Sequence, residues 1–348
     1  MLSVSVTQLP LASYALIQNN VAVIQSVVIR NTSENNYKNL KVQFSFDPEF
    51  AESFTEEIIS LSAGETWQRS DIQPPINTSF ICNLTEKVVA NTKVTVLSDD
   101  GEVLAEEYDE ISVLDYCQYW GNSFMSQYLA AFVTPRHIAL DKIIKRASEL
   151  LFSWTGNSSL TAYMHDVPQR PKLIVGAIYE AIAEQKITYC APISTLTKLG
   201  QKIRTCEELL SEDRGKRGCC LDMALLMCSC LEAVGMHPLL VMMEEHAFAG
   251  CWLINDMFAD SINDDPTVIT KRTAVGINEI ILVETTCAND GNNIDFDKAV
   301  VTANDKIKND GDFAFVLDIA RARLAGVRPI PQRIFDGEKY IVDNPEPE

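Results

Sequence analysis

The stretch Gly218-Cys219-Cys220-Leu221-Asp222-Met223-Ala224-Leu225-Leu226 decides how the second half of the chain folds. Apolar residues continue from it at helical spacing to residue 233, so the stretch predicts a buried helix over residues 220–233. Cys220 then lies in the first helical turn, where free backbone N–H groups stabilise a thiolate. Cys219 points elsewhere, because adjacent residues diverge by about 100° on a helix. The pattern therefore favours Cys220 as a nucleophile.

Two side chains further along the chain provide what a cysteine nucleophile requires. His246 opens a predicted strand and would act as base toward Cys220, then as acid toward the leaving group. Glu284 ends a later predicted strand, where an acid among apolar residues needs a partner. It is the best candidate to hold the second ring nitrogen of His246, with Asp256 and Asp260 as rivals in a polar segment.

The surroundings of Cys220 suggest further roles. Either the Gln201 side chain or the backbone N–H of Cys220 could bind an oxyanion, and Gly218 would let a substrate backbone approach. Asp222 in the first turn is best interpreted as a helix-stabilising acid. Cys228 and Cys230 are two apart on the predicted helix and face away from each other, and no C-x-x-C pair exists. We therefore expect no metal site and no cofactor.

Composition restricts the classes of function. The 348 residues are 47% hydrophobic and 22% charged, which is typical of a soluble globular protein. The 48 acidic and 29 basic residues give a net charge of -19, which repels phosphate and argues against direct nucleic-acid binding. The start of the chain lacks the pattern of a signal peptide, and no run is apolar enough to predict a membrane span. With ten cysteines as free thiols, we expect a cytoplasmic protein.

The chain divides into a strand-rich part and a mixed part. Residues 1–112 predict about seven short strands separated by turns, one of them at residues 80–84, which suggests an immunoglobulin-like β-sandwich. Residues 113–335 predict an α+β domain, with helices that begin at Thr134-Pro135, at residue 171 and at residue 296. Residues 336–348 are expected to be a linker or tail.

Three blocks of the sequence resemble the transglutaminase-like superfamily. They are Gly218-Cys219-Cys220-Leu221-Asp222-Met223-Ala224, Glu245-His246-Ala247-Phe248 and Val283-Glu284-Thr285. Over roughly residues 125–333 the chain is most similar to the transglutaminase-like module near the N-terminus of large bacterial proteins that continue into a superfamily-one helicase. The resemblance implies a papain-like fold preceded by a β-sandwich, a Cys220–His246–Glu284 triad, and a helicase-linked role in defence against phage.

The sequence departs from this family at two positions. Cys219 stands where the module usually has threonine, so Cys219 and Cys220 could be oxidised together. The acid is Glu284 where the superfamily usually has aspartate, and it follows His246 by 38 residues.

Two functions follow as hypotheses. The first is thiol-dependent acyl transfer, in which a peptide or side-chain amide of a protein or peptide substrate is hydrolysed through an acyl-enzyme on Cys220. The alternative is a catalytically silent binding or regulatory module of a nucleic-acid-processing protein, with a helicase or nuclease domain as partner. The sequence leaves open the substrate, the oligomeric state, and the choice among hydrolysis, cross-linking and deamidation.

Overall fold

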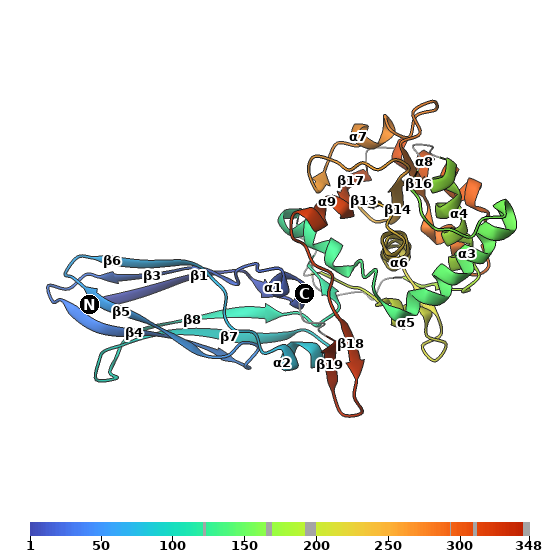
Figure 1. The fold of residues 1–348 in the computed structure, drawn as a ribbon. Helices are drawn as coiled ribbons and strands as arrows, with labels where there is room; N and C mark the ends of the chain where they lie inside the picture. The colour runs from blue at the N-terminus through green and yellow to red at the C-terminus, as the bar shows by residue number, and fades with distance from the viewer. Residues whose placement is uncertain (121–122, 165–168, 192–199, 293, 309–311, 344–348) are drawn as a thin grey trace. The chain divides into compact units, whose positions relative to one another are not determined.

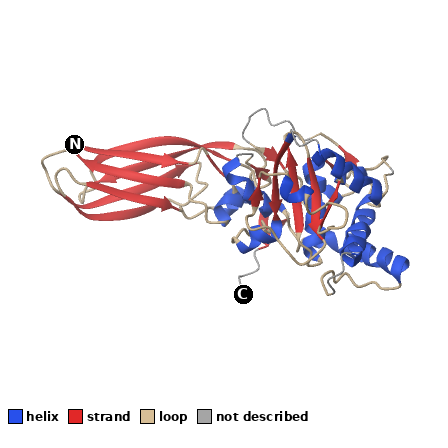
Figure 2. Cartoon of the chain, turned by 90° about the horizontal axis from the view of Figure 1, so that it is seen from above, coloured by secondary structure: helices blue, strands red, loops and turns tan. Residues whose placement is uncertain are grey.

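The computed structural model describes residues 1–120, 123–164, 169–191, 200–292, 294–308 and 312–343 (Figure 1). The chain is a mixed α and β protein that forms two compact units. One unit comprises Met1–Gln118 together with the C-terminal segment from Pro331, and the other comprises Tyr119–Ile330. Figure 2 shows that the first unit is built mainly of strands, whereas helices surround the sheet of the second.

Among the described residues, the first unit contains two larger sheets, one with strand order β1-β3-β6 and one with order β2-β8-β7-β4-β5, and a two-stranded sheet from its C-terminal segment. Buried and exposed residues alternate along β4, as expected for a strand with one face in the core. Leu40, Val42, Phe44 and Phe46 lie on its buried face. The strands are β1 Leu2–Gln8, β2 Leu11–Ala12, β3 Ile24–Asn31, β4 Tyr37–Asp47, β5 Phe54–Leu61, β6 Thr66–Ile72, β7 Val88–Leu97 and β8 Val103–Val113, and the helices are α1 Tyr14–Gln18 and α2 Thr78–Asn83.

Two segments of this unit differ from the prediction. Residues 80–84 were expected to form a strand, but the Asn77 side chain accepts a hydrogen bond from Phe80 N and caps α2 there. The segment expected as a linker, residues 336–348, contains β19 Tyr340–Asp343, which pairs as a hairpin with β18 Gln332–Phe335. Tyr340 N donates to Asn83 Oδ1 over 2.7 Å, so the hairpin packs on α2. Residues 344–348 of the expected tail lie outside the described residues.

The second unit is organised around a five-stranded antiparallel sheet with strand order β15-β17-β13-β14-β16. Its strands are β13 Pro238–Met243, β14 Ala247–Trp252, β15 Ile262–Asn263, β16 Ile280–Val283 and β17 Phe313–Asp318. Short strands lie outside this sheet: β9 Gln118–Tyr119 at the junction of the units, β10 Thr188–Tyr189, β11 Gln201–Lys202 and β12 Arg217–Gly218. Along the chain, the two units change at residues 118/119 and 330/331, and the segment from Pro331 belongs to the first unit.

Helices pack around this sheet. The longer ones are α3 Asp141–Thr155, α4 Gln169–Ala183, α6 Cys220–Ala233 and α8 Phe296–Lys308, and the shorter ones are α5 Cys206–Leu210, α7 Thr267–Thr270 and α9 Ile319–Leu324, with 3-10 helices η1 Ser123–Phe132, η2 Ile138–Leu140 and η3 Thr285–Ala288. The predicted start at Thr134 is wrong, because Thr134 N donates to Ser229 Oγ of α6 and α3 begins at Asp141. Within the described residues, no helix combines the length and apolarity that crossing a bilayer requires.

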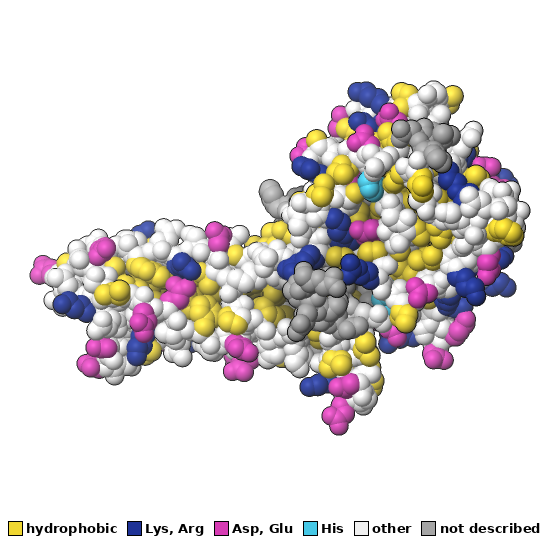
Figure 3. Space-filling model, in the orientation of Figure 1, with side chains coloured by type: hydrophobic (Ala, Val, Ile, Leu, Met, Phe, Trp, Pro, Cys, Tyr) yellow, Lys and Arg dark blue, Asp and Glu magenta, His cyan; other side chains and the backbone are white. Residues whose placement is uncertain are grey.

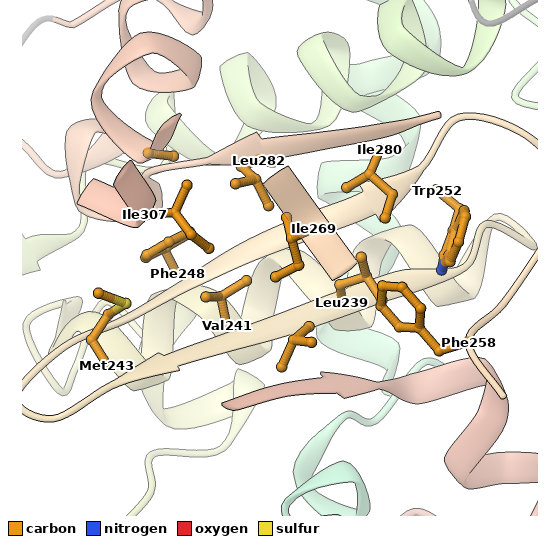
Figure 4. Close-up of a cluster of buried hydrophobic side chains, with 12 residues drawn as sticks. Leu239, Val241, Met243, Phe248, Trp252, Phe258, Ile269, Ile280, Leu282 and Ile307 are labelled. Carbon is orange, nitrogen blue, oxygen red and sulfur yellow. The ribbon is translucent and has the colours of Figure 1, made fainter. Parts of the chain in front are cut away.

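The two faces of the sheet have separate cores. Figure 4 shows Leu239, Val241, Phe248 and Leu282 on one face, packed with Ile307 of α8. Alternate residues of a strand point to opposite faces, so Ala247, Ala249 and Cys251 of β14 point to the other face, against which α6 packs. In Figure 1, α6 is seen nearly end-on beside β14. The helix that carries Cys220 is therefore anchored on the centre of the sheet.

Acidic side chains are scattered over the visible surface of each unit in Figure 3, as expected for a net charge of -19.

Candidate functional site

The strand pairing explains how residues 38 positions apart come together. His246 directly precedes β14, and Glu284 directly follows β16. These strands are antiparallel neighbours with Ala249 opposite Val283, so the start of one lies beside the end of the other. His246 Nε2 lies 2.7 Å from Glu284 Oε2, which is hydrogen-bond distance.

Cys220 is the first residue of α6 and is 8% exposed. The imidazole of His246 hydrogen-bonds to its thiol, and the backbone N–H of Ala247 donates to it as well. Because Glu284 occupies Nε2 of His246, the ring nitrogen left for Cys220 is Nδ1. The structure thus brings Cys220, His246 and Glu284 into one hydrogen-bonded series.

The electrostatics of this series favour a thiolate–imidazolium pair. A hydrogen bond from the Cys219 thiol, followed by those from His246 and Ala247, holds the pKa of Cys220 well below its usual range, although burial acts to raise it. Burial opposes protonation of His246, but Cys220 and Glu284 outweigh it and raise the pKa of the imidazole to about 9. Opposite charges in contact stabilise each other's ionised forms. Near neutral pH, Cys220 is therefore a nucleophile beside a protonated acid.

Glu284 is a fully engaged buried carboxylate, with 1% of its surface exposed. Its Oε1 accepts hydrogen bonds from Thr286 N and Thr286 Oγ1 at 3.1 and 2.6 Å. Its Oε2 lies 3.2 Å from Lys306 Nζ as well as against His246. Burial raises the pKa of the carboxyl, but His246, Thr286 and Lys306 together lower it to about 2. Glu284 is therefore a permanent anion that fixes the orientation of His246.

The rival acids lie elsewhere. Asp256 and Asp260 are both exposed. The backbone oxygen of Asp256 is 2.8 Å from His237 Nδ1, and the backbone oxygen of Asp260 accepts from Asn263. His165, an isolated loop histidine in the sequence, lies outside the described residues.

A second buried carboxylate, Asp222, holds the N-terminus of α6. Its Oδ2 accepts from Cys219 N at 2.9 Å and from Arg204 Nη1 at 2.8 Å, and its Oδ1 accepts from Arg204 N at 2.9 Å. Asp222 was expected to stabilise the start of the helix, but it also contacts Arg204 outside that helix. Asp222 ties the segment after β11 to the residue before the nucleophile.

Gln201 reaches the same helix end but bonds to the neighbouring sulfur. Its Nε2 donates to Cys219 Sγ over 3.4 Å. Gly200 before it has a φ of +110° and approaches the backbone oxygen of Tyr119 so closely that a Cβ would be 2.0 Å away. Only glycine fits there, and this close approach fixes the start of β11.

Gly218 packs closely against a neighbouring helix. It is buried, and a Cβ added to it would lie 2.9 Å from Leu209 Cδ1 of α5. Its oxygen accepts from Cys190 N, next to β10. A side chain at this position would have to displace Leu209, and the approach of a substrate backbone to Gly218 stays a prediction.

Three contacts of the site have no signal in the local sequence. They are the ion pair of Lys306 with Glu284, the hydrogen bonds of Thr286 to the same carboxylate, and the Arg204–Asp222 ion pair. In the described part of the chain, no group of three or more His, Cys, Asp or Glu side chains is arranged to hold a metal ion. The arrangement suits covalent catalysis by a thiol with acid–base assistance.

Comparison with known proteins identifies no relative that supports this assignment of chemistry. No family model and no curated protein matches the chain. Among solved structures, an exo-chitosanase from Amycolatopsis orientalis has a TM-score of 0.21 at 15% identity, covering 34% of this chain and 12% of that chain. A family 76 glycoside hydrolase from a bovine Bacteroides thetaiotaomicron strain has a TM-score of 0.16 at 10% identity, covering 53% and 39%. Scores this low do not indicate a shared fold.

Proposed function

We propose that this chain catalyses thiol-dependent acyl transfer through an acyl-enzyme on Cys220, with a peptide or side-chain amide of a protein or peptide as substrate. The observation that carries the proposal is the hydrogen-bonded series from Cys220 through His246 to Glu284. The pKa of the Cys220 thiol is strongly lowered, whereas burial raises the pKa of Cys228 and Cys230 on the same helix.

In the first step, the Cys220 thiolate attacks the carbonyl carbon of the amide and forms a tetrahedral intermediate. Backbone N–H groups at the start of α6 are suited to stabilise its oxyanion. Gln201 would take part only after leaving Cys219 Sγ. The imidazolium of His246 then gives its proton to the departing amine, which leaves a thioester on Cys220.

In the second step, neutral His246 removes a proton from water or from an acceptor amine, which attacks the thioester and restores the thiolate. Glu284 keeps the same contact with Nε2 throughout, and so holds the ring and its tautomer. Attack by water gives hydrolysis or deamidation, and attack by an amine gives cross-linking. The three outcomes differ only in the acceptor and the acyl donor.

The fold is compatible with this assignment. We propose that the two-sheet unit is an immunoglobulin-like sandwich and that residues 119–330 adopt a transglutaminase-like arrangement. Support comes from the nucleophile at the start of the α6 helix, the histidine at the start of β14 and the acid at the end of β16. This order of elements agrees with the three sequence blocks that resemble the superfamily.

An activated ester tests the acyl-enzyme without knowledge of the substrate. With p-nitrophenyl acetate, the protein should release a rapid burst of one p-nitrophenolate per chain and retain one acetyl group. Cleavage before aspartates gives a peptide of residues 213–221, whose only cysteines are Cys219 and Cys220, and Cys220 should carry the acetyl group. Cys220→Ala should abolish the burst.

The matched control is Cys230→Ala, which removes a buried thiol from the same helix. It should retain the burst. A protein that acetylates Cys220 no faster than Cys228 or Cys230 would leave only the alternative of a silent binding module.

A further inference from the structure

Cys219 directly precedes the candidate nucleophile, at the N-cap of α6. It is 0% exposed and occupies the position before α6 in an extended conformation, with φ -91° and ψ -178°. Its Sγ accepts a hydrogen bond from Gln201 Nε2 at 3.4 Å. A side-chain hydrogen bond with Cys220, and then burial, raise the pKa of Cys219, whereas the pKa of Cys220 is lowered. A protonated thiol therefore directly precedes the thiolate in the chain.

Few other thiols could react with Cys220. All ten cysteines are free, and seven of the eight outside this pair are buried. The exception is Cys190, which is half-buried and whose backbone N–H donates to Gly218 O at 3.0 Å. Cys190 thus reaches the site through its backbone contact with Gly218, two residues before Cys220, whereas Cys219 is the residue next to the nucleophile.

We propose that Cys219 and Cys220 form a reversible oxidation site for a small hydroperoxide, with Cys220 as the reacting thiolate and Cys219 as the resolving thiol. This inference rests on the nucleophilic Cys220 of the proposed function. A partly buried thiolate with 8% exposure is open to a molecule the size of hydrogen peroxide.

Two balanced steps describe the oxidation. The Cys220 thiolate attacks one oxygen of the hydroperoxide, whose O–O bond breaks, giving the sulfenic acid of Cys220 and, after proton uptake, water or an alcohol. The Cys219 sulfur then attacks the Cys220 sulfur, the S–O bond breaks, and the Cys219 proton leaves with the hydroxyl as water. Sulfur is oxidised by two electrons in total, and the peroxide is reduced by two.

The product would be easily reduced. Adjacent Cα atoms are about 3.8 Å apart, whereas unstrained disulfides join Cα atoms roughly 4.4–6.8 Å apart. A strained disulfide is more readily reduced by other thiols. The bond would silence the nucleophile, because Cys220 could no longer attack an acyl group. It would also protect Cys220 from the irreversible sulfinic and sulfonic acids.

The test uses the full chain, hydrogen peroxide and mass spectrometry. After oxidation, free thiols are blocked in denaturant and the peptide 213–221 is released as above. We expect this peptide to be unblocked and lighter by two hydrogen atoms, and dithiothreitol to restore the p-nitrophenyl acetate burst in full. A peptide that carries sulfinic acid in place of the disulfide would overturn the inference.

Two variants separate the roles of the neighbouring thiols. Cys219→Ser retains a group that can accept from Gln201, and peroxide should inactivate it without recovery by dithiothreitol. Cys190→Ser is the matched control and should recover as the natural protein does. Full recovery of Cys219→Ser, or loss of recovery in Cys190→Ser, would assign the resolving role to another thiol.

The burst before oxidation distinguishes failure of this inference from failure of the proposed function. If unoxidised protein shows no burst on Cys220, the acyl-transfer proposal fails, and the oxidation site loses its basis. If the burst is normal but peroxide produces no disulfide in residues 213–221, the inference alone fails.

Discussion

Lys306 Nζ lies 3.2 Å from Glu284 Oε2, the same carboxylate oxygen that His246 Nε2 approaches to 2.7 Å. The buried Glu284 carboxylate therefore contacts both the Lys306 ammonium group and the His246 imidazole. The positive charge of Lys306 helps to keep Glu284 ionised, and it opposes protonation of the imidazole. Lys306 is thus a positioning residue, which acts on the thiol through the carboxylate.

The variant Lys306→Met tests this coupling through pH. Step one of the proposed reaction needs protonated His246, so turnover should fall as pH rises through about 9, the raised pKa of the imidazole. Removing the lysine charge removes a repulsion, so the pKa of His246 should rise further and the alkaline limb should shift upward by roughly a few tenths of a pH unit. The pH profile of the acylation rate with an amide such as p-nitroacetanilide, whose departing amine takes the proton of His246, measures the shift.

Lys308→Met provides the matched control for this shift. Lys308 belongs to the same helix but pairs with the exposed Asp305 at 2.9 Å. Its removal should leave the alkaline limb unchanged. Equal shifts in both variants would mean that general charge, rather than the contact with Glu284, sets the imidazole pKa.

A second prediction concerns the thiolate itself. Because the pKa of Cys220 is lowered, its reactive form persists as pH falls below the usual range of a cysteine, and is lost only when pH falls through the lowered value. At pH 6 an ordinary thiol is largely protonated, so iodoacetamide should label Cys220 roughly tenfold or more faster than a model thiol. His246→Ala removes the charge and the hydrogen bond that lower the pKa, so labelling at pH 6 should slow.

His237→Ala is the control for this experiment, because His237 Nδ1 lies against the backbone oxygen of Asp256 rather than near the thiol. Labelling of Cys220 should be unaffected in this variant. If the rate at pH 6 is the same with and without His246, the imidazole does not stabilise the thiolate.

The third prediction isolates the charge of Glu284. Glu284→Gln keeps the length and an amide group beside His246, but the negative charge that raises the pKa of the imidazole is lost. The imidazolium should become a stronger acid and the thiolate less stable, so acylation of Cys220 should slow by about 10² near neutral pH. Stopped-flow measurement of the burst rate gives this number.

Glu279→Gln is its matched control, since Glu279 is partly exposed and its side chain lies 3.6 Å from Arg272. Its burst rate should match that of the natural protein. A Glu284→Gln variant with an unchanged rate would show that the carboxylate is structural only.

The sequence predicts the helix of Cys220 and the strands beside it because their signals are local. The apolar spacing after Cys220 and the β-branched run before Glu284 each describe one element, and the structure contains α6 and β16 at those places. The pairing of β14 with β16 is an observation of the structure, and it brings the start of one strand beside the end of the other. The sequence points to Glu284 because an acid among apolar residues needs a partner.

The remaining contacts depend on how elements pack, which no local pattern encodes. The helix α8 begins at its predicted residue, 296, but only its packing on β16 directs Lys306 toward Glu284. The hydroxyl group that donates to the Glu284 carboxylate is that of Thr286. It reaches the carboxylate because the chain enters the 3-10 helix η3 directly after Glu284. The strand expected at residues 80–84 is a helix because a single cap at Asn77 outweighs the alternating pattern.

The last prediction concerns the buried ion pair of Arg204 with Asp222. The Asp222 carboxylate is fully buried, the Arg204 side chain is 14% exposed, and the closest atoms are 2.8 Å apart. Asp222→Asn leaves the guanidinium without its counter-charge and removes an acceptor from Cys219 N or Arg204 N. Breaking a buried pair on one side costs about 3–5 kcal/mol, so the free energy of unfolding should fall by that order in urea titrations.

The double variant Asp222→Asn with Arg204→Met should recover part of this loss, because the unpaired buried charge is gone. Glu208→Gln is the control: its partner Arg214 is exposed, and the loss should be at most about 1 kcal/mol. Since Asp222 also fixes the backbone of Cys219, the single variant should slow acylation of Cys220 even where it remains folded. Equal losses for Asp222→Asn and Glu208→Gln, with an unchanged burst rate, would mean that this ion pair neither stabilises the fold nor positions the nucleophile.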